Sequence, residues 1–362
     1  MQLALWRDRW LGAREFQWWA VRLPGVRQIA RHHAERLFDL CGGFVASQVL
    51  YACVRSGLIE ELRAGPCSAR QLSERCHLDS QGLQLLLESA EELGLVERRD
   101  ACWGLAILGA ALAGNPAVLR MIEHQPQLYA DLADPLERLR SDSSPGALAN
   151  FWTYARQQPR AAVGAVGPYT RLMATTQALV AEDTLHAYPF GQHRVALDVG
   201  GGDGTFLCAL AQRWPGLALR LFDLPEVARI AEARFTAEGL AARTVVTGGD
   251  FLVDALPTGA DVITLVRVLH DHDDGPALAL LEAARRALPS GGRLVIAEPM
   301  RSVRGSFVSA TLYLRFYLRA MGQGRLRTPA EISVLLGAAG FSQVRRHRTL
   351  RPWQCALMSA AA

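Results

Sequence analysis

The chain has 362 residues, of which half are hydrophobic and a fifth are charged. This is long enough for two domains with sizeable cores, and the balance is that of an ordinary globular protein. The formal net charge of +4 is too small for this length to indicate a nucleic-acid-binding surface by itself. Seven cysteines without a Cys-x-x-Cys pair indicate free thiols in the cytoplasm and no disulfide framework.

The first 36 residues differ in composition from the rest of the chain. They contain four of the eight tryptophans, and seven arginines against three acidic residues. Indole rings favour the headgroup depth of a membrane, and arginine pairs with anionic lipid. The segment therefore predicts a peripheral membrane contact; the alternative is a dimerisation arm or a helix packed on the body. No uninterrupted apolar run reaches about 18 residues, so we expect no transmembrane helix, and we expect no secretory signal.

Residues 37–115 have the pattern of a winged helix, with two helices followed by a small hairpin. Ser68 and Gln71 fit a capping box at the start of the first helix. The second helix follows Asp79 and is expected to stop at Gly94. Winged helices often bind DNA, but this second helix carries three glutamates and no arginine. We therefore expect a dimerisation domain and no nucleic-acid partner.

Residues 116–185 have the pattern of amphipathic helices that link this domain to a catalytic domain over residues 186–362. Trp152 and Met173 in the linker, with Phe316 further along the chain, are candidates for the lining of a substrate pocket. Such residues at helical spacing are more often part of a hydrophobic core, and both interpretations stay open.

From residue 194 onward, apolar strands alternate with helices, and the chain closes with a helix and two strands. Continuous apolar strands are typical of a parallel sheet that is covered on both faces. We predict an α/β fold: a Rossmann-like parallel sheet with a terminal antiparallel hairpin, joined to a mainly helical N-terminal winged-helix domain.

The stretch VALDVGGGDGTF (195–206) predicts a strand, a glycine-rich turn and a helix. Gly200, Gly202 and Gly204 let the backbone turn tightly and approach a ligand closely. The spacing is not the Gly-x-Gly-x-x-Gly of a dinucleotide fold. Asp198 at the strand end would repel a pyrophosphate but attract a sulfonium and its amino-acid portion. The motif therefore favours S-adenosylmethionine over NAD as the cofactor.

Two further strand ends carry residues that an adenosine would need. Asp223 follows the glycine turn by about twenty residues, where a carboxylate can accept both ribose hydroxyls. Asp250 can accept from the adenine amino group, and Phe251 can stack on the ring. Aspartate at one strand end is commonly a turn residue, but three such ends at one sheet edge predict a cofactor site. Leu224 is counted with these binding residues.

The stretch LVRVLHDHDDG (265–275) ends a fourth strand on the same edge. Its two histidines and three aspartates could hold a metal, but no third strand-end histidine or cysteine is in view, and we predict no metal. A neutral imidazole suits a general base, so His270 is the candidate for the proton acceptor. Arg267 is counted with the cofactor-binding residues, and His272 with packing. The three aspartates fit turn and cap positions, and Asp271 could also assist the base.

These motifs resemble those of the plant- and bacterial-type small-molecule O-methyltransferases. DVGGGDGTF, FDLPEV, GGDF, LHDHDD and AEPM fall in that family's order, and the resemblance covers nearly all of the chain after residue 37. It implies a class I S-adenosylmethionine domain, a winged-helix dimerisation domain and a homodimer. His270 takes the place of the family's base in Leu-His-Asp-Trp, and Glu298 matches a glutamate that holds it. The plant members' second flanking glutamate is replaced near Leu326, so the resemblance implies one carboxylate at the base.

LFDLCGGFVASQVL, YTRLMATTQALVAEDTL and AMGQGRLRTPAEI further resemble bacterial enzymes that methylate the 1-hydroxyl of acyclic carotenoids. This implies a hydrophobic carotenoid substrate of photosynthetic bacteria and a position in the cytoplasm or peripherally on the intracytoplasmic membrane. One alternative is another apolar acceptor, such as an aromatic polyketide or a bacteriochlorophyll precursor. A second alternative is a non-catalytic winged-helix regulator, against which the acidic second helix argues.

Overall fold

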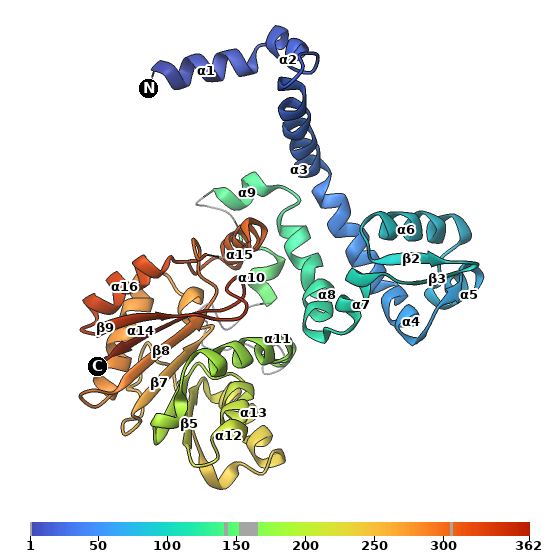
Figure 1. Cartoon of the computed structure of the whole chain (residues 1–362). Helices are drawn as coiled ribbons and strands as arrows, with labels where there is room; N and C mark the ends of the chain where they lie inside the picture. The colour runs from blue at the N-terminus through green and yellow to red at the C-terminus, as the bar shows by residue number, and fades with distance from the viewer. Residues whose placement is uncertain (1, 141–143, 152–165, 305–306) are drawn as a thin grey trace. The chain divides into compact units, whose positions relative to one another are not determined.

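The computed structural model describes residues 2–140, 144–151, 166–304 and 307–362, and for residues 151 and 166–175 the description is confined to the backbone. The chain divides into two compact units, Met1–Glu123 and His124–Ala362 (Figure 1). The boundary falls inside the predicted linker, 116–185.

The N-terminal unit is mainly helical. Its elements are α1 (Gln2–Gly12), α2 (Arg14–Ala20), α3 (Val26–Arg55), α4 (Leu58–Ala64), β1 (Cys67–Ser68), α5 (Ala69–Cys76), α6 (Ser80–Glu92), β2 (Val96–Arg99), β3 (Cys102–Leu105), α7 (Ile107–Ala113) and the first part of α8 (Pro116–Asp131). The three strands form a small antiparallel sheet in the order β1-β3-β2.

The predicted order of helix, helix and hairpin is confirmed in α5, α6 and β2–β3. Ser68 and Gln71 form both hydrogen bonds of the capping box at α5. The side chain of Asp79 caps α6 by accepting from the backbone N–H of Gly82 at 2.7 Å. Gly94 follows α6 with a φ of 68°, the left-handed conformation that favours glycine. The local signals in the sequence therefore set these helix ends.

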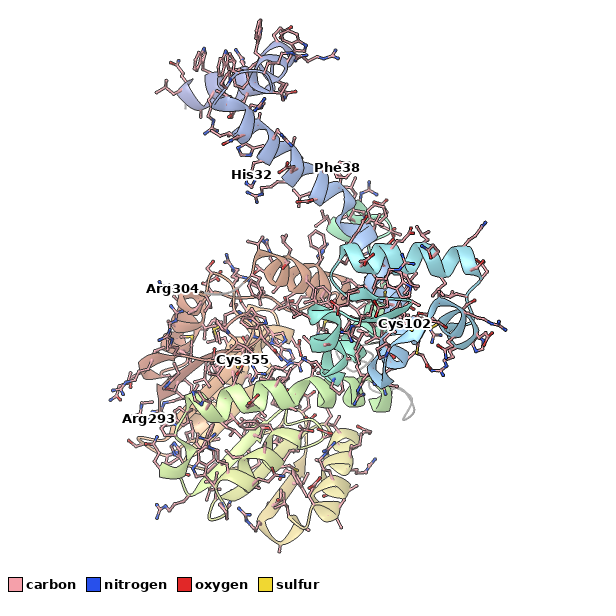
Figure 2. The ribbon with its side chains drawn as sticks, turned by 45° about the vertical axis from the view of Figure 1, so that its right-hand side comes forward. His32, Phe38, Cys102, Arg293, Arg304 and Cys355 are labelled. Atoms are coloured by element: carbon pink, nitrogen blue, oxygen red, sulfur yellow. The ribbon has the colours of Figure 1, made fainter. Side chains whose placement is uncertain are left out.

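Helix α3 carries a stripe of exposed apolar side chains. Leu37, Phe38, Leu40 and Phe44 are each at least 65% exposed, and Phe38 is labelled on this helix in Figure 2. By length and composition alone, α3 is the one helix among the described residues that could cross a membrane. The absence of a transmembrane helix stays a prediction. The end of the same helix packs into the core of the N-terminal unit, where Cys53 is fully buried.

The C-terminal unit alternates strands and helices. After the rest of α8, its elements are α9 (Pro135–Leu139), α10 (Ala147–Phe151), α11 (Val166–Ala187), β4 (Val195–Val199), α12 (Thr205–Arg213), β5 (Ala218–Asp223), α13 (Pro225–Ala237), β6 (Thr244–Gly248), β7 (Val262–Val266), α14 (Asp274–Ala287), β8 (Arg293–Glu298), α15 (Val308–Met321), α16 (Pro329–Ala338), β9 (Ser342–His347) and β10 (Ala356–Ala361).

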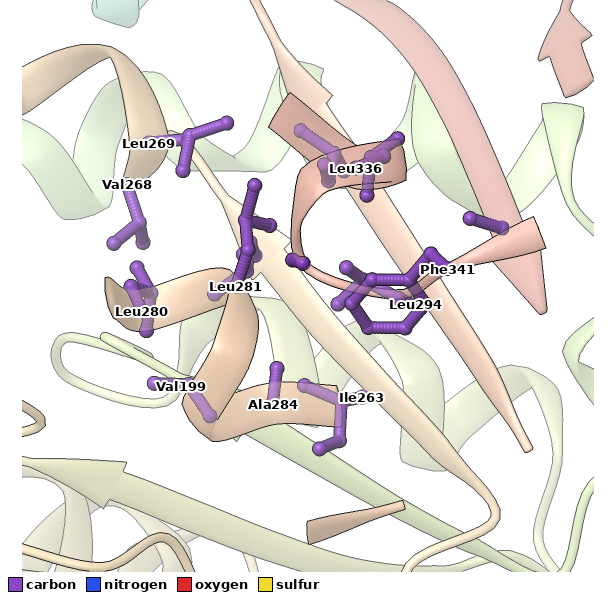
Figure 3. Close-up of a cluster of buried hydrophobic side chains, with 14 of the residues drawn as sticks. Val199, Ile263, Val268, Leu269, Leu280, Leu281, Ala284, Leu294, Leu336 and Phe341 are labelled. Atoms are coloured by element: carbon purple, nitrogen blue, oxygen red, sulfur yellow. The ribbon is translucent and has the colours of Figure 1, made fainter. Parts of the chain in front are cut away.

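One seven-stranded sheet organises this unit, in the order β6-β5-β4-β7-β8-β10-β9. The strands from β6 to β8 pair in parallel, whereas β10 pairs antiparallel with both β8 and β9. The predicted fold class, including the terminal antiparallel hairpin, is confirmed. One core packs α14 and α16 against the sheet (Figure 3), and a second packs α11, α12 and α13. Both faces are covered, as the apolar strands predicted.

Candidate active site

The glycine-rich turn after β4 has the backbone conformation that its sequence predicts. Gly200, Gly202 and Gly204 have φ values of 69°, 60° and 82°. A Cβ on Gly204 would lie 2.5 Å from the Phe235 ring, so glycine is also needed for close packing there. The turn leads directly into α12, whose N-terminal N–H groups favour electron-rich ligand groups.

Asp223 at the end of β5 is tied to this turn. Its Oδ2 accepts from the backbone N–H of Gly202 at 2.7 Å, and its Oδ1 accepts from that of Leu224 at 2.7 Å. Burial raises the pKa of Asp223 to about 6, against the lowering effect of these two bonds. The predicted pair Asp223 and Leu224 therefore lies beside the glycine turn, with carboxylate lone pairs left to accept hydroxyl groups.

Asp198 on β4 offers an unsatisfied carboxylate oxygen at the same sheet edge. Its Oδ1 accepts from the Thr264 hydroxyl at 2.6 Å, whereas Oδ2 is buried and has no hydrogen-bond partner. Burial raises the pKa of Asp198 to about 7. A buried carboxylate oxygen without a donor fits a site that receives a cationic or N–H group. The residues present therefore fit S-adenosylmethionine.

Asp250 and Phe251 follow β6 on the same edge. Asp250 Oδ1 accepts from the backbone N–H of Leu252 at 2.9 Å, so the residue closes its own turn. The Phe251 ring meets the His272 ring edge to face at 5.2 Å between centroids. This contact gives His272 a packing role and connects the predicted adenine side of the site to the turn that carries His270.

His270 lies beyond the strand, not at its end. β7 stops at Val266, and His270 is in a 3-10 turn over Leu269–Asp271. The buried side chains of Val268 and Leu269 anchor this turn in the core (Figure 3). His270 itself is only 7% exposed. The turn thus brings a buried imidazole to the edge of the sheet that carries the glycine turn.

Glu298 at the end of β8 orients the imidazole. Its Oε2 accepts from the backbone N–H of His270 at 3.0 Å and lies 3.2 Å from Nδ1. A proton on Nδ1 donated to this carboxylate leaves the lone pair on Nε2 for another proton. The predicted pairing of His270 with Glu298 is thus present in the geometry.

Asp271 is a second carboxylate at the base. Its Oδ1 lies 3.3 Å from Nε2 of His270, a distance that permits ion pairing but without hydrogen-bond alignment. Burial lowers the pKa of His270, but Asp271 and Glu298 outweigh it and the net pKa is raised. The resemblance implied one carboxylate here. The second is Asp271, the residue next to the base, whose side chain is only 16% exposed.

Arg267, the other predicted residue on this strand end, has a left-handed backbone with φ of 60°. Such a conformation is uncommon for a residue with a long side chain and is found at constrained sites. Its backbone N–H donates to the carbonyl of Ala297, and its Nη1 donates to the Thr176 hydroxyl on α11 at 2.7 Å. Arg267 thus joins β7 to α11 close to the base, and a cofactor contact stays a prediction.

The three predicted pocket residues differ in how far the structure describes them. Trp152 lies outside the described residues. Met173 lies on α11 in the part described by its backbone alone. Phe316 is half-buried on α15, and its sequence neighbours Tyr317 and Leu318 belong to a small core cluster that does not include it. Within the described ranges, no three His, Cys, Asp or Glu side chains are grouped to hold a metal.

The fold, and the glycine turn and acidic residues at the carboxyl edge of its sheet, define a class I methyltransferase. The candidate cofactor site lies beside a buried imidazole. The O-methyltransferase domain family matches residues 129–342, and the O-methyltransferase dimerisation domain family matches 38–113. The chain belongs to this O-methyltransferase family. It is an S-adenosylmethionine-dependent O-methyltransferase, and its dimerisation domain indicates a homodimer.

Two bacterial relatives are similar over most of the chain. Demethylspheroidene O-methyltransferase of Cereibacter sphaeroides is 42% identical over 97% of this chain and 93% of its own length. The protein of the same name from Rhodobacter capsulatus is 41% identical, covering 94% and 85%. Among solved structures, a mitomycin 7-O-methyltransferase has a TM-score of 0.75 at 25% identity, covering 92% of this chain and 100% of that one.

Proposed function

We propose that this enzyme methylates the 1-hydroxyl of an acyclic carotenoid, of the demethylspheroidene or 1-hydroxyneurosporene type, in spheroidene biosynthesis. The observation that carries the proposal is the similarity to the two demethylspheroidene O-methyltransferases, which extends over at least 94% of this chain. A polyene acceptor would also suit a peripheral position on the intracytoplasmic membrane.

His270 is the general base in this proposal, and Glu298 orients it. S-adenosylmethionine supplies an electrophilic methyl group when bound. A tertiary alcohol is far less acidic than imidazolium, so Nε2 of His270 accepts the hydroxyl proton only as the carbon–oxygen bond forms. Alignment of the hydroxyl and exclusion of water from the buried imidazole therefore supply much of the rate.

In this proposal the glycine turn and the acidic strand ends would hold S-adenosylmethionine. Gly200, Gly202 and Gly204 would allow its close approach, Asp223 would accept from the ribose, and the unsatisfied oxygen of Asp198 would receive the amino-acid portion. Phe251 would stack on the adenine, and Asp250 would accept from its amino group. Trp152, Met173 and Phe316 remain the residues proposed to line the acceptor pocket.

A product assay tests the acceptor. Purified protein with S-adenosylmethionine and 1-hydroxyneurosporene is expected to yield the 1-methoxy carotenoid, identified by mass and retention time. A flavonoid-type phenol, an aromatic polyketide and a chlorin are assayed in parallel. Turnover of one of these, with none of the hydroxycarotenoid, would reject the proposed substrate.

The variant His270→Ala tests the base. We expect a loss of about 10²–10⁴-fold in kcat, the usual contribution of general base catalysis, with cofactor affinity retained. His186→Ala is the matched control because His186 is exposed on α11. A loss smaller than about tenfold would show that His270 is not the base.

A further inference from the structure

The segment Gly324–Arg327 lies against the turn that carries His270. The backbone N–H of Arg325 donates to the carbonyl of His270 at 2.8 Å. Gly324 approaches so closely that a Cβ there would lie 2.6 Å from the same carbonyl oxygen, and its φ is 94°. This segment, which we call the clamp, thus covers the backbone of the proposed base.

Arg327 in the clamp is fully buried, with 0% exposure. Its Nη1 donates to the carbonyl of Leu269 at 2.9 Å, and its Nη2 donates to the carbonyl of His272 at 2.8 Å. These two carbonyls lie on either side of His270 in the sequence. One rigid guanidinium therefore spans the 3-10 turn.

The ion pair of Arg327 does not account for its burial. Its carboxylate partner is Asp274, 2.9 Å from Nε, at the first residue of α14. The Asp274 side chain is 49% exposed, and it also pairs with the half-exposed Arg325. Burying a cation against neutral carbonyls costs desolvation, and an apolar side chain of similar size often stabilises a fold as well. Holding the carbonyls of Leu269 and His272 in place explains why the guanidinium of Arg327 is buried here.

The opposite side of the turn is held by Glu298. That carboxylate bonds the backbone N–H of His270, whereas the clamp bonds the carbonyls of Leu269, His270 and His272. The backbone of the base is therefore fixed from β8 on one side and from the segment before α16 on the other. The backbone sets the direction of the Cα–Cβ bond of His270, and the contact of Nδ1 with Glu298 then sets the ring, so the two together determine where Nε2 points.

We propose that Arg327 is a positioning residue that sets the orientation of His270 for proton transfer. The inference rests on the proposed function, in which His270 is the base. A shift of about 1 Å at a catalytic group can cost about 10²-fold in rate. Arg327 acts on the rate through the turn, without touching the acceptor or the cofactor.

The test compares Arg327→Met and Arg327→Lys with Arg351→Met. Arg351 is a partly buried arginine that pairs with Asp183 and Glu182 on α11 and makes none of the hydrogen bonds described above to the turn. The measurements are kcat, KM, the S-adenosylmethionine Kd, and the pKa of His270 from histidine-labelled NMR spectra, with its signal assigned from the His270→Ala protein. Concentrations of folded enzyme are normalised by thermal unfolding curves. If Arg327→Met does not fold, Arg327→Lys carries the test, because it keeps the charge and loses the paired donors.

We expect kcat about 10- to 100-fold lower in the Arg327 variants, with Kd for the cofactor changed less than about twofold. The groups that face His270 are Asp271 and His272 on its own turn, Arg267 after β7 and Glu298 on β8. A turn that moves away from Glu298 loses one of the two carboxylates that raise the pKa of His270, so this pKa should fall. Arg351→Met should lower stability alone, leaving kcat and that pKa unchanged.

Two results would overturn the inference. If kcat per folded molecule and the His270 pKa both stay at wild-type values, Arg327 has a structural role only. If the His270 pKa falls while kcat is unchanged, the clamp holds the turn but His270 is not the base. The second result, together with an active His270→Ala enzyme, locates the failure in the proposed function.

Discussion

One oxygen of Glu298 contacts His270 at two atoms. Oε2 lies 3.0 Å from the backbone nitrogen and 3.2 Å from Nδ1, and the Glu298 side chain is completely buried. The carboxylate therefore fixes both the peptide and the ring of the same residue. Its charge also stabilises a protonated imidazole, which links the orientation of the base to its titration.

The pH dependence of kcat/KM is the first prediction. Burial lowers the pKa of His270, but Asp271 and Glu298 raise it more, so the net pKa lies above 6.5. Neutral imidazole is the active form, so kcat/KM rises with pH through a midpoint above 6.5. Glu298→Gln and Asp271→Asn each remove a raising charge and should move that midpoint to lower pH. Glu238→Gln is the control, because Glu238 is exposed and directly follows α13. A midpoint that moves upward would contradict the prediction.

Cofactor binding should be coupled to the ionisation of Asp198. Burial raises its pKa to about 7 in the cofactor-free protein, and a cationic group beside it would favour the charged form. Binding of S-adenosylmethionine should therefore release protons near pH 7 and weaken as the pH falls below 7. Calorimetry in buffers of different ionisation enthalpy measures this release. Asp198→Asn should abolish it and weaken binding about 10- to 100-fold.

Asp198→Asn should weaken cofactor binding, but it should stabilise the cofactor-free protein at high pH. The folded pKa of Asp198 lies above its unfolded value, so its contribution to stability is present at low pH and lost as pH rises through about 7. Asn cannot ionise, so the cofactor-free Asp198→Asn protein should have a higher Tm than wild type at pH 8. The exposed Glu232→Gln on α13 is the control. If the variant has a Tm below that of wild type at pH 8, the ionised Asp198 carboxylate does not destabilise the folded protein, and the prediction is wrong.

The apolar stripe of α3 is expected to lie in the homodimer interface. Leu37, Leu40 and Phe44 recur at helical spacing and are at least 65% exposed in the single chain. Leu40→Glu with Phe44→Glu should therefore yield monomers at micromolar concentration in light-scattering chromatography. Val334→Glu on α16 is the matched control, because Val334 is also exposed at 72%. An intact dimer in the double variant would place the interface elsewhere.

The N-terminal tryptophans are expected to bind anionic membranes. Trp6, Trp10, Trp18 and Trp19 are all at least 51% exposed on α1 and α2, and the Arg22 guanidinium lies over Trp18 at 3.7 Å. Less protein should sediment with anionic vesicles when Trp6 and Trp10 are both changed to Ala. High salt should likewise reduce the amount of wild-type protein that sediments. Trp353→Ala is the control. Equal sedimentation of all three proteins would reject this segment as the membrane contact.

The sheet and its binding edge could be predicted from the sequence because their signals are local. The glycine turn, Asp223 and His270 each follow an apolar strand, and the carboxyl ends of parallel strands meet at one edge. Helix α15 was not predicted. Its N-cap is Phe307, which makes no side-chain capping bond, so the sequence carries no start signal there.

The low exposure of Asp271 and the position of Arg327 near the base could not be predicted from the sequence, because both depend on tertiary packing. Asp271 lies in an acidic stretch that is typical of a solvated turn, yet its side chain is only 16% exposed. Its burial depends on how the whole turn packs. Arg327 is one of many arginines in the sequence, and only the tertiary structure brings it to Leu269. Local patterns do not encode such contacts.

The bond between Arg327 and Leu269 joins residues 58 positions apart. Contacts of this sequence separation require closure of a long loop, so they form late in folding. A refolding chain should acquire most of its helix content before the turn around His270 becomes fixed. Recovery of activity should then lag behind recovery of the circular dichroism signal, and the amide of His270 should exchange its hydrogen faster than those in the middle of β7.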